Sequence, residues 1–300
     1  MATLREVICD RCREHVVAGN LVMGQCLSAV GFVGGTLPAD VPLTELPMAD
    51  VAGAYFAVGA ALAGRRPILV LRYQGFGWYA AAALVNYAAK SKTLWGRPCP
   101  VLVRGVAMEG GIGPVAGSSH HSLYHRMPEL KIYAPVTPYE WSAAYREFIA
   151  GDDPVYLSEH RGSYDNAFEL ENVDRPRTQL TLFPISITRF AAAAAATRLA
   201  YEMYDVSVCH VFRLKPFSPP AWALDGLHTS GRGLVIDDDY PSGVASALAT
   251  ELSAATGATV EVMGLPDRTA GFAPRLDVLP PTAEEIYQRC LDILQKERLT

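Results

Sequence analysis

Short apolar runs that alternate with helical stretches restrict the folds open to this chain. In the first half of the sequence these runs lie at residues 68–71, 100–105, 131–134 and 154–157. Helical stretches flank and separate them at residues 4–17, 47–64, 76–92 and 138–149. Mostly apolar runs of this length, rich in β-branched residues, are typical of strands buried on both faces of a parallel sheet. The pattern therefore predicts an α/β domain with a largely parallel sheet.

A second alternation of the same kind follows residues 162–180, whose polar composition is typical of a linker. Strands are expected at residues 185–190, 206–212, 233–236 and 260–262, and helices at residues 191–204, 242–256 and 282–297. The sequence therefore predicts two three-layer α/β/α domains with largely parallel sheets, at residues 1–175 and 176–300.

Composition narrows the class of protein. Half of the 300 residues are hydrophobic, 19% are charged and the net charge is -5. This balance is that of a globular protein and gives little support to nucleic-acid binding. No stretch approaches the ~20 uninterrupted apolar residues of a membrane span, and charged residues crowd the N-terminus where a signal peptide would be apolar. We therefore expect a cytoplasmic protein.

Cysteine spacing offers one further candidate site. The chain has six cysteines, and Cys9 and Cys12 form a C-x-x-C pair with no second pair elsewhere. A lone pair of this kind favours reduced structural thiols over a zinc or redox site.

Residues 47–64 form the most apolar of the expected helices. Pro47 precedes the stretch and Gly64 ends it, as is typical at helix limits. The residues between them are mostly small and apolar, with one carboxylate, Asp50, near the start. A helix that is apolar all round is expected to be buried, and a buried acid needs a partner. An ordinary first-turn acid that interacts with the helix dipole is the alternative.

Polar residues follow several of the expected strands. Since parallel sheets bind ligands at the carboxyl ends of their strands, the loops after Leu71, Arg104 and Leu157 are expected to lie near one another. The candidate chemistry in and beside these loops is carried by Asp50, residues 73–76, residues 118–122 and residues 159–161.

Segments in both halves of the chain match a known family in order. They lie at residues 46–68, 84–90, 100–105, 128–131 and 154–160, and then at residues 214–219, 235–243 and 279–286. On these segments the chain resembles the beta subunit of the thiamine-diphosphate-dependent decarboxylase component of 2-oxo-acid dehydrogenases, a pyruvate dehydrogenase beta-like branch of the transketolase superfamily. The resemblance implies a pyrimidine-binding domain followed by a transketolase C-terminal domain.

The resemblance gives Asp50 a catalytic role. In the family a glutamate hydrogen-bonds a nitrogen of the cofactor's aminopyrimidine ring, and Asp50, nine residues before Gly59, is the matching position. An aspartate carboxylate reaches less far from the backbone than a glutamate carboxylate, by the length of one carbon–carbon bond, ~1.5 Å. A misplacement of about this size can lower a rate on the order of a hundredfold. Glu45, five residues earlier, is an alternative acid.

The resemblance also implies other site residues. Phe76 matches an aromatic that stacks on the pyrimidine ring, with an ordinary core residue as the alternative, and Met48 and Tyr79 match further positions lining that ring. His120 or His121 lies where the family has a histidine that contacts the substrate, and His125 is a third candidate. No metal ligand is expected in this chain. The segment at residues 159–161 is interpreted as a subunit contact or as the edge of the site.

The family's diphosphate signature is missing. Thiamine enzymes hold magnesium and the diphosphate with Gly-Asp-Gly and an asparagine about thirty residues later, and this chain has no Gly-Asp-Gly. The resemblance therefore implies an alpha-type partner subunit that holds Mg²⁺ and the diphosphate, in a heterotetramer with two copies of each subunit.

Three functions remain open from the sequence. The first is a subunit that cleaves a small 2-oxo acid and passes on the acyl or aldehyde unit. The second is a split transketolase-type transferase of a specialised pathway, and the third is a catalytically silent paralogue that stabilises a partner. A Rossmann dehydrogenase is disfavoured because no Gly-x-Gly-x-x-Gly follows an expected strand.

Overall fold

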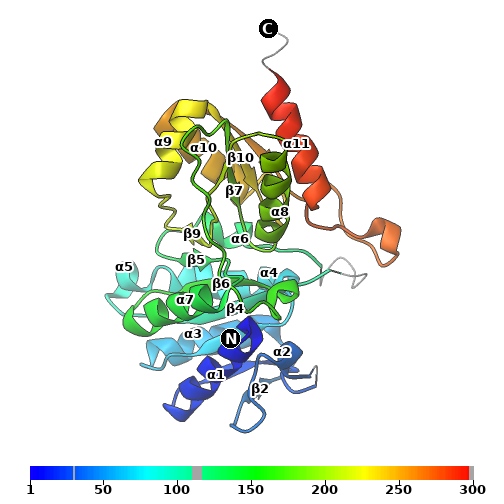
Figure 1. Cartoon of the computed structure of the whole chain (residues 1–300). Helices are drawn as coiled ribbons and strands as arrows, with labels where there is room; N and C mark the ends of the chain where they lie inside the picture. Colours follow the sequence, from blue (N-terminus) through cyan, green and yellow to red (C-terminus); the bar gives the residue numbers. More distant parts are fainter. Residues whose placement is uncertain (30, 110–116, 297–300) are drawn as a thin grey trace. The chain divides into compact units, whose positions relative to one another are not determined.

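The chain forms two compact units in the computed structural model, which describes residues 1–29, 31–109 and 117–296 (Figure 1). Unit 1 comprises the described residues of Met1–Glu169 together with Arg213–Pro216 and Ala270–Asp277, and unit 2 comprises the rest. Each unit has its own sheet.

Unit 1 is built on a seven-stranded sheet in the order β2-β1-β3-β4-β6-β5-β9. Its strands are β1 Val22–Gln25, β2 Thr44–Leu46, β3 Ile68–Leu71, β4 Leu102–Ala107, β5 Lys131–Tyr133, β6 Val155–His160 and β9 Arg213–Lys215. All neighbours are parallel except β5 and β9, which pair antiparallel. The central strands β3, β4 and β6 are buried along their whole length, as expected of a sheet covered on both faces.

Two helical layers cover this sheet. The helices are α1 Leu4–Val17, α3 Asp50–Leu62, α4 Gly77–Ala83, α5 Ser91–Trp95, α6 Ser122–His125 and α7 Pro138–Ala150. α3 connects β2 to β3 and α4 connects β3 to β4, both in the same direction across the sheet. α7 connects β5 to β6 in the opposite direction. Because such crossovers are right-handed, α3 and α4 lie on one face and α7 on the other, where α1 packs against it.

Unit 2 repeats the architecture on a parallel four-stranded sheet in the order β11-β10-β7-β8. The strands are β7 Leu180–Pro184, β8 Val206–Val208, β10 Arg232–Ile236 and β11 Thr259–Met263. The helices are α8 Thr188–Tyr201, α9 Ala221–Ser230, α10 Val244–Thr256 and α11 Ala283–Gln295. α8 packs against α11 and α9 against α10, on opposite sides of the strands (Figure 1). The expected α/β class with largely parallel sheets is thus confirmed.

Several expected elements are confirmed, and some bounds are wrong. The helix expected at residues 4–17 is α1, whose capping box at Thr3 and Glu6 fixes its first turn. The strand expected at residues 185–190 is wrong, because β7 ends at Pro184 and the Thr188 side chain donates to the Ile185 carbonyl as α8 begins. The helix expected at residues 76–92 is interrupted in the structure. A 3₁₀ turn ends at Phe76, a π turn spans Leu84–Ala88, and a new helix begins after Lys90.

The helix α3 departs from its expected environment. One face is buried through residues such as Ala54, Ala57 and Val58, but the opposite face carries Val51 at 49% exposure and Phe56 at 56%. Within this single chain, α3 is therefore buried on one face and exposed on the other. Ring contacts extend the exposed face: Tyr55 lies 5.4 Å from Tyr87, and Tyr87 stacks on Trp95 at 6.2 Å. We call Val51, Tyr55, Phe56, Tyr87 and Trp95 the α3 surface.

Among the described residues, no helix is both long enough and apolar enough to cross a membrane.

Candidate functional site

A pocket of about 500 Å³, open to solvent, lies at the start of α3 in unit 1. Met48, Asp50 and Phe76 line it, together with apolar residues of the neighbouring strands such as Leu46 and Val70. We call it the α3 pocket. Three of the four residues expected to bind the pyrimidine ring thus share one pocket, although they come from segments separated by up to 28 positions in the sequence. The fourth, Tyr79, lies in α4 with 56% exposure and is not part of this lining.

Asp50 is the first residue of α3 and is half-buried. Its side chain therefore lies at the positive end of the helix dipole. Asp50 is also the one acidic residue in the described lining of the α3 pocket, whose other walls are mostly apolar. A flat aromatic ring with a single ring nitrogen facing an acid would suit such a pocket.

Glu45 is engaged elsewhere. Its carboxylate accepts hydrogen bonds from the backbone amides of Leu27 at 3.0 Å and Ser28 at 2.9 Å, and from the Ser28 hydroxyl at 3.0 Å. Partial burial opposes ionisation of Glu45, but these hydrogen bonds lower its pKa overall. Glu45 therefore holds the turn after β1, and Asp50 is the acid available to a ligand in the α3 pocket.

Phe76 closes a 3₁₀ turn, Gln74–Phe76, that follows β3. Its ring meets Tyr73 edge to face, with centroids 5.7 Å apart, and it is half-buried. Met48 is 84% exposed at the rim of the pocket. An exposed methionine and a half-buried aromatic beside an open pocket are side chains that a ligand or a partner subunit could cover.

A buried glutamine connects the ends of three strands to the histidine segment. Gln74 Nε2 donates to Ser158 Oγ at 2.8 Å and to the Gly105 carbonyl at 3.3 Å, and Oε1 accepts from the His120 amide at 2.7 Å. His121 Nδ1 lies 3.0 Å from Ser158 Oγ. The loops after β3, β4 and β6 therefore converge, as the parallel sheet predicts.

The two adjacent histidines have different environments. His121 is fully buried and linked to Ser158, whereas His120 is half-buried and held through its backbone amide by Gln74. His125 lies in α6, where its carbonyl accepts a hydrogen bond from Lys215 Nζ at 2.6 Å. Residues 110–116 of the Gly- and Ser-rich loop expected before the histidines lie outside the described residues.

Gln74 lies within the candidate segment at residues 73–76, whereas Ser158 lies one residue before the candidate segment at residues 159–161. Ser158 is a polar residue directly after an apolar run, within the buried strand β6. A polar residue at that place is a usable signal, because a buried hydroxyl needs a hydrogen-bond partner.

Glu159 belongs to the core of unit 1. It forms a bidentate ion pair with Arg104, at 2.7 and 2.8 Å, and both side chains are at most 1% exposed. Trp141 Nε1 and the Tyr164 hydroxyl also donate to its carboxylate. Burial disfavours a charged guanidinium, but the pair with Glu159 outweighs this and raises the pKa of Arg104. Glu159 is therefore a core residue of unit 1, and the interpretation of residues 159–161 as a subunit contact or as the edge of the site stays a prediction.

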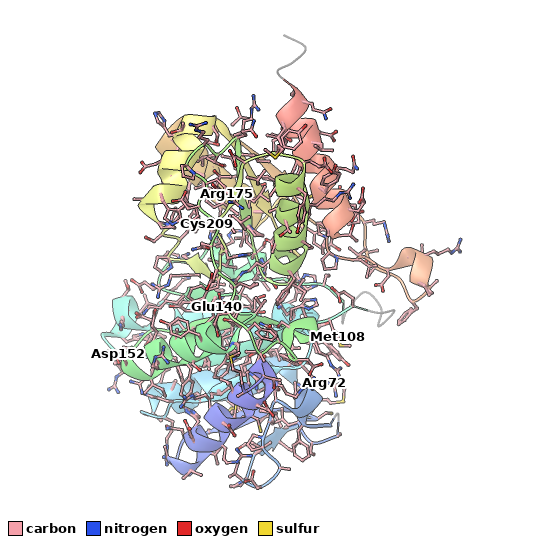
Figure 2. The ribbon with its side chains drawn as sticks, in the orientation of Figure 1. Arg72, Met108, Glu140, Asp152, Arg175 and Cys209 are labelled. Atoms are coloured by element: carbon pink, nitrogen blue, oxygen red, sulfur yellow. The ribbon has the colours of Figure 1, made fainter. Side chains whose placement is uncertain are left out.

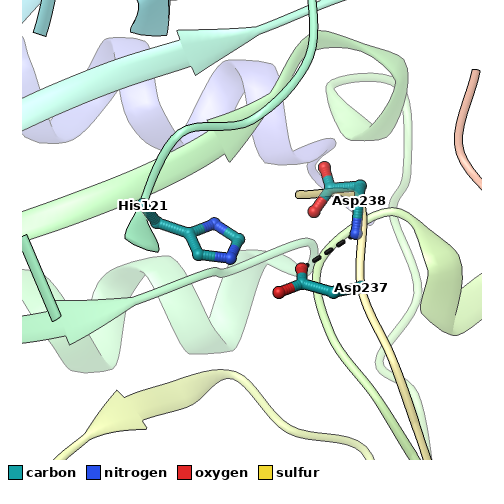
Figure 3. Close-up of side chains that lie close together, drawn as sticks. All are labelled: His121, Asp237 and Asp238. Atoms are coloured by element: carbon teal, nitrogen blue, oxygen red, sulfur yellow. Dashed lines mark hydrogen bonds between the residues drawn. The ribbon is translucent and has the colours of Figure 1, made fainter. Parts of the chain in front are cut away.

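Unit 2 carries an acidic segment of its own after β10. Asp237, Asp238 and Asp239 are all buried, and hydrogen bonds satisfy part of their oxygens. The Asp238 amide donates to Asp237 Oδ1 at 2.8 Å (Figure 3), and Ser186 Oγ donates to Asp238 Oδ2 at 3.0 Å.

Comparison with known families matches both units. A family model described as "Transketolase, pyrimidine binding domain" covers residues 39–166, and one described as "Transketolase, C-terminal domain" covers residues 171–286. The chain carries both of these transketolase domains. The Gln74 network lies within the residues matched to the pyrimidine-binding domain, and so does the lining of the α3 pocket except for Gly24, Gln25 and Cys26.

Several relatives of this chain are named as beta subunits. The beta subunit of acetoin:2,6-dichlorophenolindophenol oxidoreductase from Cupriavidus necator is 26% identical over 267 residues, covering 81% of this chain and 78% of that protein. The pyruvate dehydrogenase E1 component subunit beta from Rickettsia felis is 24% identical over 311 residues, covering 94% of each. The 2-oxoisovalerate dehydrogenase subunit beta from Bacillus subtilis is 26% identical, covering 71% of this chain and 72% of that protein.

One solved structure has the same fold over almost the whole chain. A chain described as "Split gene transketolase, inactive beta4 tetramer" superposes with a TM-score of 0.74, covers 98% of both chains and is 17% identical. At this identity the likeness shows a shared fold.

Proposed function

We propose that this chain is the pyrimidine-binding subunit of a heteromeric thiamine-diphosphate enzyme that cleaves a small 2-oxo acid or ketol and transfers the resulting acyl or aldehyde unit. The observation that carries the proposal is the α3 pocket, in which one carboxylate and one aromatic lie beside Arg72 among mostly apolar walls. The beta-subunit names of the relatives support the same class.

The lining of the α3 pocket suits the aminopyrimidine half of the cofactor. Phe76 and the apolar strand residues would hold the flat ring, and Asp50 would hold a proton on one ring nitrogen. Thiamine diphosphate, when bound, supplies the nucleophilic carbon and the electron sink for cleaving a bond beside a carbonyl. The task of this chain is to orient the ring and to fix the position of that proton.

The histidine segment would serve the substrate. His120 and His121 adjoin Gln74, which belongs to the same 3₁₀ turn as Phe76. An imidazole at this place can donate a hydrogen bond to a substrate oxygen or exchange a proton with it near neutral pH. The buried hydrogen bond between His121 and Ser158 would fix the orientation of one ring.

A partner subunit is part of the proposal. The α3 surface exposes large apolar side chains next to the α3 pocket, which is typical of a surface that another chain covers. An alpha-type subunit would bring the Mg²⁺ and diphosphate ligands that the family requires, in an α2β2 assembly in the cytoplasm.

Calorimetry with a candidate alpha-type subunit tests this proposal. The chain is purified alone and with that subunit, and each sample is titrated with thiamine diphosphate and magnesium. We expect binding by the complex and not by the chain alone, because the diphosphate ligands come from the partner. Tight binding by the chain alone would contradict the division of the site between two subunits.

A second candidate keeps the cofactor and changes the reaction. Asp50 in place of glutamate alters the catalytic edge of the pocket, which supports a split transketolase-type transferase that forms a new bond to an acceptor. Turnover that needs a lipoyl carrier would favour the dehydrogenase reaction, and turnover with a free aldehyde or amine acceptor would favour the transferase. Cofactor binding without turnover on any 2-oxo acid or ketol would instead favour the silent paralogue.

A further inference from the structure

Two arginines and a methionine occupy equivalent positions at the ends of three adjacent parallel strands. Arg72, Met108 and Arg161 are each the first residue after a strand, namely β3, β4 and β6. Their side chains line a second pocket of about 310 Å³, open to solvent, together with Val33 and Gly34. Figure 2 labels Arg72 and Met108, which lie near one another in unit 1. We call this the arginine pocket.

Neither arginine is neutralised by a carboxylate within the described part of the chain. The Arg72 guanidinium lies 5.0 Å from the centre of the Tyr73 ring, and Arg161 Nη1 lies 3.8 Å from Met108 Sδ. Arg104, on the neighbouring strand, has a bidentate partner instead. The acid next to Met108, Glu109, lies 3.1 Å from His160 Nε2.

A left-handed turn forms the opposite wall of the arginine pocket. Phe32, Val33 and Gly34 have φ values of 52°, 53° and 69°, a conformation that costs energy for the two non-glycine residues. The Arg161 guanidinium lies against this turn, since a Cβ on Gly34 would come within 3.4 Å of its Nε. The glycine thus leaves the room that the guanidinium occupies.

Arg72 also connects the two pockets, because it lines both the arginine pocket and the α3 pocket. A group bound by the two arginines would therefore lie beside the place where the pyrimidine ring and the reacting carbonyl are proposed to meet. Guanidinium groups bind carboxylates and phosphates through paired hydrogen bonds and are always charged, so two of them facing one pocket suit a single oxyanion.

We propose that Arg72 and Arg161 bind an anionic group, carboxylate or phosphate, at the end of the substrate remote from the reacting carbonyl. The inference rests on the proposed function for the identity of the substrate, and it narrows that substrate to a dicarboxylic 2-oxo acid or a phosphorylated ketol. Pyruvate-like substrates, whose one carboxylate adjoins the reacting carbonyl, would leave the arginine pocket unused.

Titration of the purified chain with small anions tests the proposal. The probes are 2-oxoglutarate, ribose 5-phosphate and the uncharged ketol hydroxyacetone, measured by calorimetry at low salt. We expect one of the two anions to bind and hydroxyacetone not to bind. Arg72→Gln and Arg161→Gln should each weaken anion binding about tenfold to a hundredfold, the usual loss for a hydrogen bond to a charged group. Preference for one anion then decides between the carboxylate and the phosphate.

Arg97→Gln is the matched control. Arg97 is an exposed arginine that precedes β4, so it lies near the amino-terminal ends of the strands, opposite the arginine pocket. Its replacement should leave anion binding unchanged. Thermal unfolding shows whether each variant is folded. Equal anion binding in all variants, or no binding of either anion by the wild-type chain at about 10 mM, would overturn the proposal.

A separate titration keeps the two proposals apart. The complex of the wild-type chain with its alpha-type subunit is titrated with an aminopyrimidine fragment of thiamine, which probes the α3 pocket without an anionic group. Anion binding without fragment binding would remove the thiamine function and leave the arginine pocket as an anion site. Fragment binding without anion binding would leave the proposed function and overturn this inference.

Discussion

At the scale of single residues, the position of Asp50 at the start of α3 decides how the α3 pocket can work. Asp50 begins the helix, and its side chain lines the open pocket. A cofactor ring that packs on Phe76 would have to approach Asp50 more closely than it would approach a glutamate, since the aspartate side chain is shorter. The shape of the pocket and the length of this one side chain are therefore linked.

Replacement of Asp50 tests that link. In the assembled complex, Asp50→Asn should slow hydrogen–deuterium exchange at the thiazolium carbon about a hundredfold or more, because general acid–base groups contribute on that order. Asp50→Glu, which keeps an acid, should retain measurable exchange. Assembly should be unaffected in both variants. Exchange in Asp50→Asn at the wild-type rate would remove Asp50 from the mechanism.

Glu159 gives a prediction about stability. Glu159→Gln keeps the shape of the side chain but leaves the Arg104 guanidinium buried without a counter-charge. We expect the free energy of unfolding to fall by about 3–5 kcal/mol, the usual effect of removing one partner of a buried ion pair. Urea unfolding of the variant measures this. A loss of under about 1 kcal/mol, the range of exposed pairs, would contradict the role assigned to the pair.

His210 gives a prediction about pH. Burial in unit 2, with the positive charge of Arg189 nearby, lowers the pKa of His210 to about 3 from 6.5. Because folding favours the neutral ring, its contribution is complete above pH 6.5 and is lost as the pH falls toward 3. Between pH 7 and 5 this one group removes up to about 2 kcal/mol of unfolding free energy. Urea unfolding at both pH values should show a smaller loss in His210→Asn, and an unchanged loss would contradict this.

At the scale of elements, α3 is divided into a buried face and an exposed apolar face. The sequence alone could not separate these faces, because Val51, Tyr55 and Phe56 are as apolar as the residues that pack on the sheet. Periodicity reveals a buried face only when the opposite face is polar. The helix α3 lacks that contrast, so the sequence predicted the helix but not which of its faces packs on the sheet.

A charge on the α3 surface should block assembly. Phe56→Asp places a carboxylate where an apolar side chain is 56% exposed, so the chain should fold but bind the alpha-type subunit at least thirtyfold more weakly, as for an interface hot spot. Co-purification and light scattering measure the complex. Tyr201→Asp, at an 85% exposed site in unit 2, is the matched control and should assemble normally. Normal assembly of Phe56→Asp would exclude this surface as the contact.

Other elements show where sequence reasoning succeeds and fails. The strand at residues 68–71 was predicted with its true bounds because its residues are apolar without interruption and the sheet buries both faces. The edge strands β2 and β9 have three residues each and carry exposed or half-buried polar side chains, so they give no apolar run to detect. The Gln74 network is a tertiary feature that joins residues up to 84 positions apart, beyond the reach of local patterns.

At the scale of the whole molecule, the chain combines two α/β units that the family models also separate. Residues 46–76, 104–108 and 158–161 of unit 1 hold every candidate group of the α3 pocket, the Gln74 network and the arginine pocket except the turn at 31–35 and the segments near residues 24 and 120. All of these lie on the side of the unit 1 sheet where the parallel strands have their carboxyl ends. The site residues themselves stay predictions until binding to this edge is measured.

The strand β9 completes the unit 1 sheet only after part of unit 2 has been synthesised. It completes the edge of the unit 1 sheet beside β5, yet it lies after β7 and β8, the first two strands of unit 2, in the order of translation. A nascent chain that has released the first 169 residues therefore exposes the unpaired backbone of β5 until residue 215 leaves the ribosome. During that interval the incomplete sheet is a target for chaperones, and a gene cut at the apparent boundary between the units would make the exposure permanent.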